Sequence, residues 1–217
     1  MADMDAGMAA AKRGDYAAAL EQFRPLAEDG NIDAQYNLGL MFNYGLGVEQ
    51  DHGEAARWYR QSADQGNVDA QINLGSLYDD GKGVAQDFGA ARDLYVKAAE
   101  QGNSKALYNL AVMHDQGRSV PQNTTEALRL CMKSAELGAA KAQNYLGYMY
   151  DNGRGMDPNS VRAMMWYSIS AVTAQPGPDK DVATPNRDQV FQRVTPDELD
   201  EVKQLTRDWL RGHGHQA

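Results

Sequence analysis

The chain has 217 residues, 42% of them hydrophobic and 24% charged, which is the composition of a folded protein with one or two domains. A net charge of −9 argues against binding to nucleic acid, because phosphates require a basic surface, and it favours basic or neutral partners. The longest apolar runs are far shorter than the ~20 residues of a membrane-spanning helix, so no transmembrane segment is expected.

A period of 36 residues dominates the sequence. A fixed period in this range is typical of stacked supersecondary units, none of which can bury its apolar face alone. The pattern therefore predicts one elongated body built from hairpins that depend on their neighbours. Glycine, alanine and leucine each recur at this spacing, at Gly30, Gly66, Gly102 and Gly138, at Ala34, Ala70, Ala106 and Ala142, and at Leu38, Leu74, Leu110 and Leu146.

Residues 1–30 are predicted to form a divergent capping hairpin. Asp15 begins its second helix, and a short turn at Arg13 and Gly14 replaces the longer loop of the later units. A terminal unit must turn a polar face towards water, so an atypical sequence is expected there.

Residues 31–173 are predicted to contain four helical hairpins of 36 residues each. In the first of them, apolar residues at helical spacing define a first helix that ends at Gly45, because glycine adopts the left-handed conformation that helix ends favour. Asp51 then begins the second helix as its N-cap, and Glu54 is placed to complete a capping box. The N-caps of the four second helices are Asp51, Asp87, Asn123 and Asn159.

Small residues recur where neighbouring helices are expected to approach closely. Glycine costs ~1 kcal/mol inside a helix relative to alanine, so its recurrence there predicts a close contact. In the first helices these positions are Gly39, Gly75, Ala111 and Gly147. In the second helices they are Ala19, Ala55, Ala91, Ala127 and Ala163, and Ala27, Ala63, Ala99, Ala135 and Ala171.

The succession Ala-x-x-Asn-Leu-Gly, Gly-x-Gly-Val-x-Gln-Asp, Ala-x-x-Trp-Tyr and Ala-x-x-Gly resembles the Sel-1-like repeat, a member of the tetratricopeptide-like superfamily. The resemblance covers residues 15–171 and implies an all-α, right-handed α-solenoid of stacked helical hairpins with a cap at each end. The third copy departs most from the pattern, with Ala111, Cys131 and the pair Arg118–Ser119 in place of its usual residues. An altered bend or loop is therefore expected in that copy.

The C-terminal part changes character. Residues 174–186 are rich in proline and glycine and are predicted to be an irregular connector, whereas residues 187–211 are predicted to be capping helices. Thr195 and Glu198 indicate an N-terminal capping box, and the last helix has one apolar face. We interpret it as a lid over the last repeat, with docking onto a partner as the alternative, and residues 212–217 as a flexible tail. The apolar face comprises Leu199, Val202, Leu205, Thr206 and Trp209.

No catalytic motif is recognisable. The sequence has no P-loop, nucleophile elbow, zinc-binding motif or paired cysteines, so we predict no catalytic residue, no cofactor and no metal site. Cys131 is expected to be a small core residue. Some secreted Sel-1-like proteins are rich in cysteine and have been linked to binding or hydrolysing β-lactams. A single cysteine cannot build that arrangement, so a hydrolase or small-ligand binder is the alternative rather than the leading interpretation.

The resemblance implies that function lies in a concave groove formed by the first helices. Acidic groups beside aromatic rings in this groove would suit a basic or mixed peptide, although an aspartate near a helix end is also ordinary solvated surface. The predicted groove residues are Tyr36, Leu40, Asn43, Ile72, Ser76, Asp79, Tyr108, Val112, Asp115, Asn144, Tyr148 and Asp151.

The leading functional hypothesis is a non-enzymatic adaptor that holds a partner protein or peptide in this groove. A structural segment of a larger assembly, recruited through the helix at 198–209, is a further hypothesis. Met1 leads directly into polar sequence, which predicts either a cytoplasmic protein or a mature periplasmic or secreted form with an added methionine. The sequence indicates neither the oligomeric state nor the identity of the partner.

Overall fold

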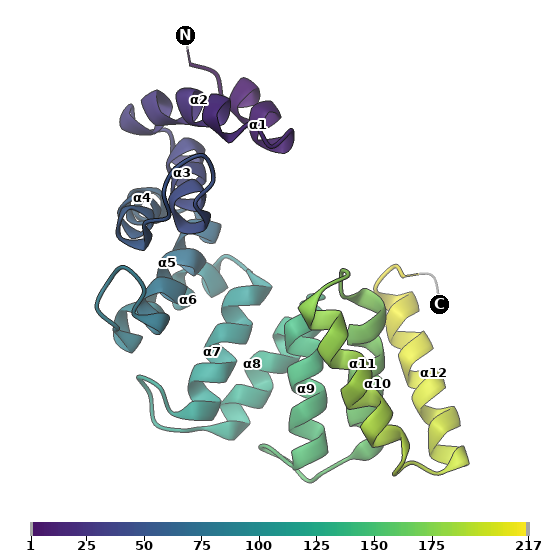
Figure 1. Ribbon diagram of the computed structural model, residues 1–217. Coiled ribbons are helices and arrows are strands. Elements are labelled where there is room, and N and C mark those ends of the chain that lie inside the picture. The colour runs from purple at the N-terminus through teal and green to yellow at the C-terminus, as the bar shows by residue number, and fades with distance from the viewer. Residues whose placement is uncertain (1, 216–217) are drawn as a thin grey trace. The chain divides into compact units, whose positions relative to one another are not determined.

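The computed structural model describes residues 2–215, which form α-helices and no β-strand (Figure 1). The chain divides into an N-terminal unit, Met1–Gly102, and a C-terminal unit, Asn103–Ala217. The helices of the N-terminal unit are α1 (Met4–Lys12), α2 (Tyr16–Glu28), α3 (Ile32–Tyr44), α4 (His52–Asp64), α5 (Val68–Asp80) and α6 (Phe88–Glu100). Those of the C-terminal unit are α7 (Ser104–Gln116), α8 (Thr124–Glu136), α9 (Ala140–Asn152), α10 (Ser160–Thr173), α11 (Pro178–Phe191) and α12 (Pro196–Gly212).

Each unit is built from helical hairpins that pack on one another. In the N-terminal unit α1 packs on α2, α3 on α4, and α5 on α6, and the hairpins are joined by the contacts of α2 with α3 and of α4 with α5. In the C-terminal unit α7 packs on α8 and α9 on α10, and α8 also packs on α9. The predicted all-α fold of repeated hairpins is confirmed. No helix in residues 2–215 combines the length and the apolar character needed to cross a bilayer.

The predicted helix caps are formed, with one exception. The side chains of all four predicted N-caps of the second helices accept backbone hydrogen bonds from the first turn, and Gly45 ends α3 with φ of 67°. The predicted capping box at Asp51 is wrong in one respect, because the side chain of Glu54 does not accept a hydrogen bond from the backbone of Asp51. The carboxylate of Glu54 accepts instead from Arg57, at 2.8 Å from Nη2, because arginine offers it a charged donor one turn along α4.

The glycines inside the first helices face tyrosine rings of the second helices. A β-carbon at Gly147 would lie 2.6 Å from Cδ1 of Tyr167, and one at Gly75 would lie 2.7 Å from Cε1 of Tyr95. The predicted close contact is confirmed, and its partner is the aromatic ring of the same hairpin. The third hairpin, where alanine replaces glycine, has the smaller Cys131 in place of tyrosine. The two substitutions in the third copy are therefore complementary in volume.

The loop of the third hairpin keeps the backbone conformation of the others. Ser119 has φ of 63°, and its glycine counterparts Gly47, Gly83 and Gly155 have φ of 71°, 67° and 79°. The expectation of an altered loop is wrong on this point, because the serine adopts the left-handed conformation despite its β-carbon. Ser119 is the only non-glycine residue in the described chain with positive φ.

Buried glutamines join consecutive hairpins, a feature that the sequence analysis did not identify. Gln35 donates from Nε2 to the carbonyl of Ala27 at 3.1 Å, and Gln143 donates to that of Ala135 at 3.2 Å. The glutamines are almost fully buried, at 4% and 0% exposure, so each polar group requires a partner. The signal in the sequence is Gln35, Gln71 and Gln143 at one position of the repeat.

The connector predicted for residues 174–186 is largely helical. α11 begins at Pro178, with proline in its first turn and two aspartates, Asp179 and Asp181, in the same turn. Both features favour a helix start, because proline fits the first turn and carboxylates stabilise the N-terminal end of the helix dipole. The proline-rich composition indicated the start of this helix rather than irregular backbone.

The last helix packs on the last hairpin, as the lid interpretation requires. α11 and α12 both contact α10 (Figure 1). Val202, Trp209 and Leu210 of α12 are buried, and the capping box of Thr195 and Glu198 is present. The apolar face of α12 is therefore partly covered within the chain, since Val202 and Trp209 are buried whereas Leu199, Leu205 and Thr206 are half-buried.

Residues 213–215, which belong to the predicted flexible tail, are exposed, and the ring of His213 packs back on α12. The ring of His213 stacks on Trp209 with centroids 3.8 Å apart, and its Nε2 lies 3.1 Å from a carboxylate oxygen of Glu136 on α8. Trp209 donates from Nε1 to the same oxygen at 3.1 Å. Residues 216 and 217 of the predicted tail lie outside the described residues.

We expect His213→Ala to lower the free energy of unfolding by about 1 kcal/mol, because it removes the stacked ring and a polar contact to Glu136. Urea denaturation followed by tryptophan fluorescence measures this change. Lys203→Ala is the matched control, since the pair of Lys203 with Asp200 is exposed and is expected to contribute less than about 0.5 kcal/mol. Equal effects of the two substitutions would show that His213 does not hold α12.

Candidate functional site

The twelve predicted groove residues lie on the first helices, which are α3 and α5 in one unit and α7 and α9 in the other. We call this side of each unit its first-helix face. Most of the twelve are half-buried or exposed, but two are not accessible. Ile72 is 7% exposed and Asp115 is 4% exposed, so the expectation that they face a partner is wrong. Ile72 lies in the apolar interior, and Asp115 is enclosed by ion pairing, as described below.

A cavity of about 360 Å³ opens on the first-helix face of the N-terminal unit. Two predicted groove residues, Asn43 and Ser76, line it. The remaining lining residues come from α3 and α5, from the loops that follow them and from the start of α4, namely Tyr44, Gln50, His52, Asn73, Leu77, Asp80 and Lys82. Amide, hydroxyl and charged groups dominate this wall, so the cavity offers hydrogen-bonding partners rather than an apolar socket.

Hydrogen bonds within the chain orient the polar wall of this cavity. Gln50 donates from Nε2 to the carbonyl of Asn43 at 2.7 Å, and Nδ1 of His52 lies 3.0 Å from Oδ1 of Asn43. The ammonium of Lys82 lies 2.8 Å from the carboxylate of Asp80. Gln86 and Gln122 repeat the bond of Gln50 in the next two hairpins, so glutamine at this position of the repeat is the signal for it.

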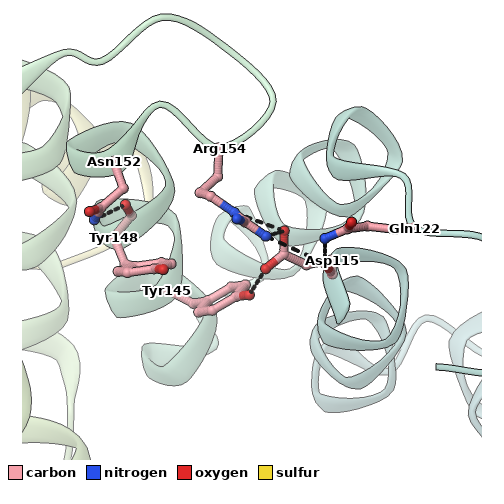
Figure 2. Close-up of polar contacts among 6 residues, drawn as sticks. All are labelled: Asp115, Gln122, Tyr145, Tyr148, Asn152 and Arg154. Atoms are coloured by element: carbon pink, nitrogen blue, oxygen red, sulfur yellow. Dashed lines mark hydrogen bonds and ion pairs between the residues drawn. The ribbon is translucent and has the colours of Figure 1, made fainter. Parts of the chain in front are cut away.

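Asp115 is the centre of a polar network in the C-terminal unit. Figure 2 shows Arg154 and Tyr145 directed at its carboxylate. Nη2 of Arg154 donates to Oδ1 at 2.7 Å, and the hydroxyl of Tyr145 donates to Oδ2 at 2.5 Å. Gln122 donates to the backbone carbonyl of Asp115 at 2.6 Å. Asp115 therefore joins two consecutive hairpins and is not a free acid for a partner.

The network also shifts the pKa of its members. Burial first, and then the hydrogen bond to Asp115, raise the pKa of the Tyr145 hydroxyl well above its ordinary value. The hydrogen bond to Asp115 is the main reason why the pKa of Arg154 is raised. The Tyr145 hydroxyl therefore stays neutral and the Arg154 guanidinium stays charged across the physiological pH range.

Two other predicted groove residues are engaged by α11 and by Arg193 of the loop that follows it. Arg193 donates from Nη2 to Oδ1 of Asp151 at 2.6 Å, and Asn186 donates from Nδ2 to Oδ1 of Asn144 at 3.2 Å. In this unit the acids predicted to bind a partner, Asp115 and Asp151, are both paired with arginines of the same chain. These ion pairs explain why Asp115 and Asp151 lie near the ends of their helices, because each aspartate joins its helix to a later segment of the chain.

Aromatic rings contribute to the accessible part of the first-helix face in the C-terminal unit. The rings of Tyr108 and Tyr145 meet edge to face with centroids 5.9 Å apart, and Tyr145 stacks on Tyr148 at 5.6 Å. Tyr148 is 40% exposed. A second cavity, of about 220 Å³, is lined by Tyr108, Lys141, Asn144, Tyr145, Asp179 and Val182. Tyr145 and the α11 residues were not among the predicted groove residues.

The described residues offer binding surfaces more readily than reactive groups. Within residues 2–215 no three histidine, cysteine or acidic side chains are grouped so as to hold a metal ion. Cys131 is fully buried, its Sγ lies 3.3 Å from the carbonyl oxygen of Ala142, and burial strongly raises the pKa of its thiol. A buried thiol of this kind is a poor nucleophile, and it packs as the predicted core residue.

Hairpins repeated along both units, joined by buried glutamines and capped by a terminal helix, define a helical-repeat protein of the tetratricopeptide-like class. The model of the Sel1 repeat matches residues 32–67, 68–103, 104–138 and 140–171. The chain belongs to the Sel1 repeat family. The predicted resemblance is thereby confirmed. Sel1 repeat folds are commonly protein-interaction scaffolds and are generally not enzymes.

Solved structures share this fold. A Sel1 repeat protein from Oxalobacter formigenes is 30% identical with a TM-score of 0.69, and the match covers 83% of this chain and 80% of that one. The protective antigen c5321 of uropathogenic Escherichia coli is 28% identical with a TM-score of 0.54, over 91% of this chain and 49% of that one. The immunity protein Pa5087 of Pseudomonas aeruginosa shares the fold at 18% identity and a TM-score of 0.51, over 89% and 76% of the two chains. No curated protein matches this chain.

Proposed function

We propose that this chain is a non-enzymatic scaffold that binds a segment of a partner protein, or a peptide, on its first-helix faces. The observation that supports the proposal is the position of the two cavities. Each opens beside first-helix residues that the repeat pattern had singled out, Asn43 and Ser76 in one unit and Tyr108 and Asn144 in the other.

The chemistry of these faces suits a polar or basic segment. The N-terminal cavity presents amide and hydroxyl groups that can pair with the backbone of an extended peptide. The C-terminal face presents tyrosines, which bind with little loss of side-chain entropy because they rotate about only two bonds. The net charge of −9 adds a general attraction for basic partners. The β-lactam-linked alternative gains no support from the buried Cys131.

Photo-crosslinking tests the proposal. A benzoylphenylalanine placed at the exposed Ser76 is expected to capture a partner in cells of the native host, and the same group at Val96 on α6 serves as the control. Val96 is 37% exposed and lies on a second helix, away from the cavity. The captured protein is then purified for affinity measurements.

We expect Ser76→Arg to weaken binding of that purified partner by at least about tenfold, because the added side chain obstructs the cavity. Val96→Arg is expected to change the affinity by less than about twofold. Circular dichroism confirms that both variants are folded. Crosslinks obtained only from position 96, or equal loss of affinity in the two variants, would show that the partner binds elsewhere.

A further inference from the structure

The cavity of the C-terminal unit lies where α11, which is outside the four matched repeats, meets the first-helix face. α7 contributes Tyr108, α9 contributes Lys141, Asn144 and Tyr145, and α11 contributes Asp179 and Val182. Its volume of about 220 Å³ is below the ~300 Å³ at which pockets begin to take drug-sized molecules. The space suits one side chain of a larger partner.

The aromatic wall of this cavity is held in place before any partner arrives. The hydroxyl of Tyr145 is fixed by Asp115, which is itself fixed by Arg154, and the ring contacts Tyr108 on one side and Tyr148 on the other. A wall that is already ordered loses little conformational entropy on binding, so its contacts contribute more fully to affinity.

The charges around the cavity favour a cation. The two other acids of this face, Asp115 and Asp151, are paired with arginines, whereas Asp179 lines the cavity. Burial, then Cys131 and then the nearby carboxylate of Asp179 raise the pKa of the Tyr108 hydroxyl. Aromatic faces attract cations through their quadrupole, and a carboxylate adds a charge-assisted hydrogen bond. Lys141 is exposed, so its ammonium is hydrated and opposes a bound cation only weakly.

We propose that this cavity is a socket for an arginine or lysine side chain of the partner segment. The inference rests on the proposed function and names the residue type that the C-terminal unit recognises. An apolar side chain would fill the same space without a group to pair with Asp179. An acidic one would meet both the carboxylate and the ring faces with the wrong sign.

Nuclear magnetic resonance with short peptides tests the socket on the full chain. The probes are capped Gly-Arg-Gly and capped Gly-norleucine-Gly, which have unbranched side chains and differ in charge. We expect the arginine peptide to shift the amide signals of Tyr108, Asn144 and Asp179 saturably, with an affinity at least about threefold higher than that of the norleucine peptide.

Three variants sharpen the test. Asp179→Asn is expected to reduce the affinity for the arginine peptide to about that for norleucine, and Lys141→Gln to raise it by about twofold. Asp181→Asn is the matched control, because this exposed aspartate lies on the same turn of α11 and outside the cavity, and it should leave the affinity unchanged. Circular dichroism and the amide spectrum establish that each variant is folded.

Equal shifts from the two peptides, or equal effects of Asp179→Asn and Asp181→Asn, would overturn the socket. Absence of shifts with both peptides at millimolar concentration would overturn it as well. If Asp179→Asn disturbs α11, the Lys141→Gln variant still tests the socket, because only a site for a cation gains affinity for the arginine peptide when a positive charge is removed. Failure of the socket while crosslinking at Ser76 succeeds would leave the proposed function intact, since Ser76 belongs to the N-terminal unit.

Discussion

Arg154→Met is expected to lower the free energy of unfolding by about 3 kcal/mol, because it leaves the buried carboxylate of Asp115 without its cation. The carboxylate side chain is 6% exposed, whereas that of Arg154 is 34% exposed, so the effect should fall at the low end for a broken buried pair. The hydrogen bond from Tyr145 alone does not compensate for the lost charge. Chemical denaturation of the folded variant measures the change.

Arg129→Met is the matched control for this experiment. Arg129 pairs with Glu126 on the surface of α8 in the same unit, with side chains 62% and 31% exposed, and its loss should cost less than about 1 kcal/mol. Adding Asp115→Asn to Arg154→Met should recover part of the stability, because it removes the unpaired charge. If Arg154→Met lowers the free energy of unfolding no more than Arg129→Met does, the pair of Arg154 with Asp115 does not stabilise the contact between the two hairpins.

Gly147→Ala is expected to destabilise the chain by about 2 kcal/mol, although alanine is the better helix former by ~1 kcal/mol. The new β-carbon would lie 2.6 Å from the ring of Tyr167, which is only 3% exposed and cannot move freely. Helix propensity thus predicts a gain in stability and packing predicts a loss, and thermal or urea denaturation decides between them.

Two further substitutions control for helix propensity. Gly212→Ala lies near the end of α12 with no atom within 4 Å of the new β-carbon, so it should be neutral or slightly stabilising. Ala111→Gly, in the hairpin where Cys131 replaces the tyrosine, should cost about 1 kcal/mol. A rise in stability from Gly147→Ala would show that the ring moves aside and that tyrosine does not require the glycine.

The candidate site was only partly predictable. Helical phase placed Asn43, Ser76, Tyr108 and Asn144 together on the first-helix faces, and each of them lines a cavity. The same phase could not show that Asp115 is buried, because its partner Arg154 lies in a loop 39 residues later. Nor could it show that Asp179 and Val182 of α11 complete the second cavity, or that Arg193, in the loop after α11, pairs with Asp151.

The sequence by itself determined the family, the hairpin repeat and the helix caps, because these follow from short-range patterns that recur every 36 residues. The glycine positions likewise predicted a close contact between neighbouring helices. The tertiary structure alone decided which ring meets each glycine and which aspartates are paired with arginines of the same chain. Those outcomes depend on side chains brought together from distant positions, and spacing along the chain carries no information about such distances.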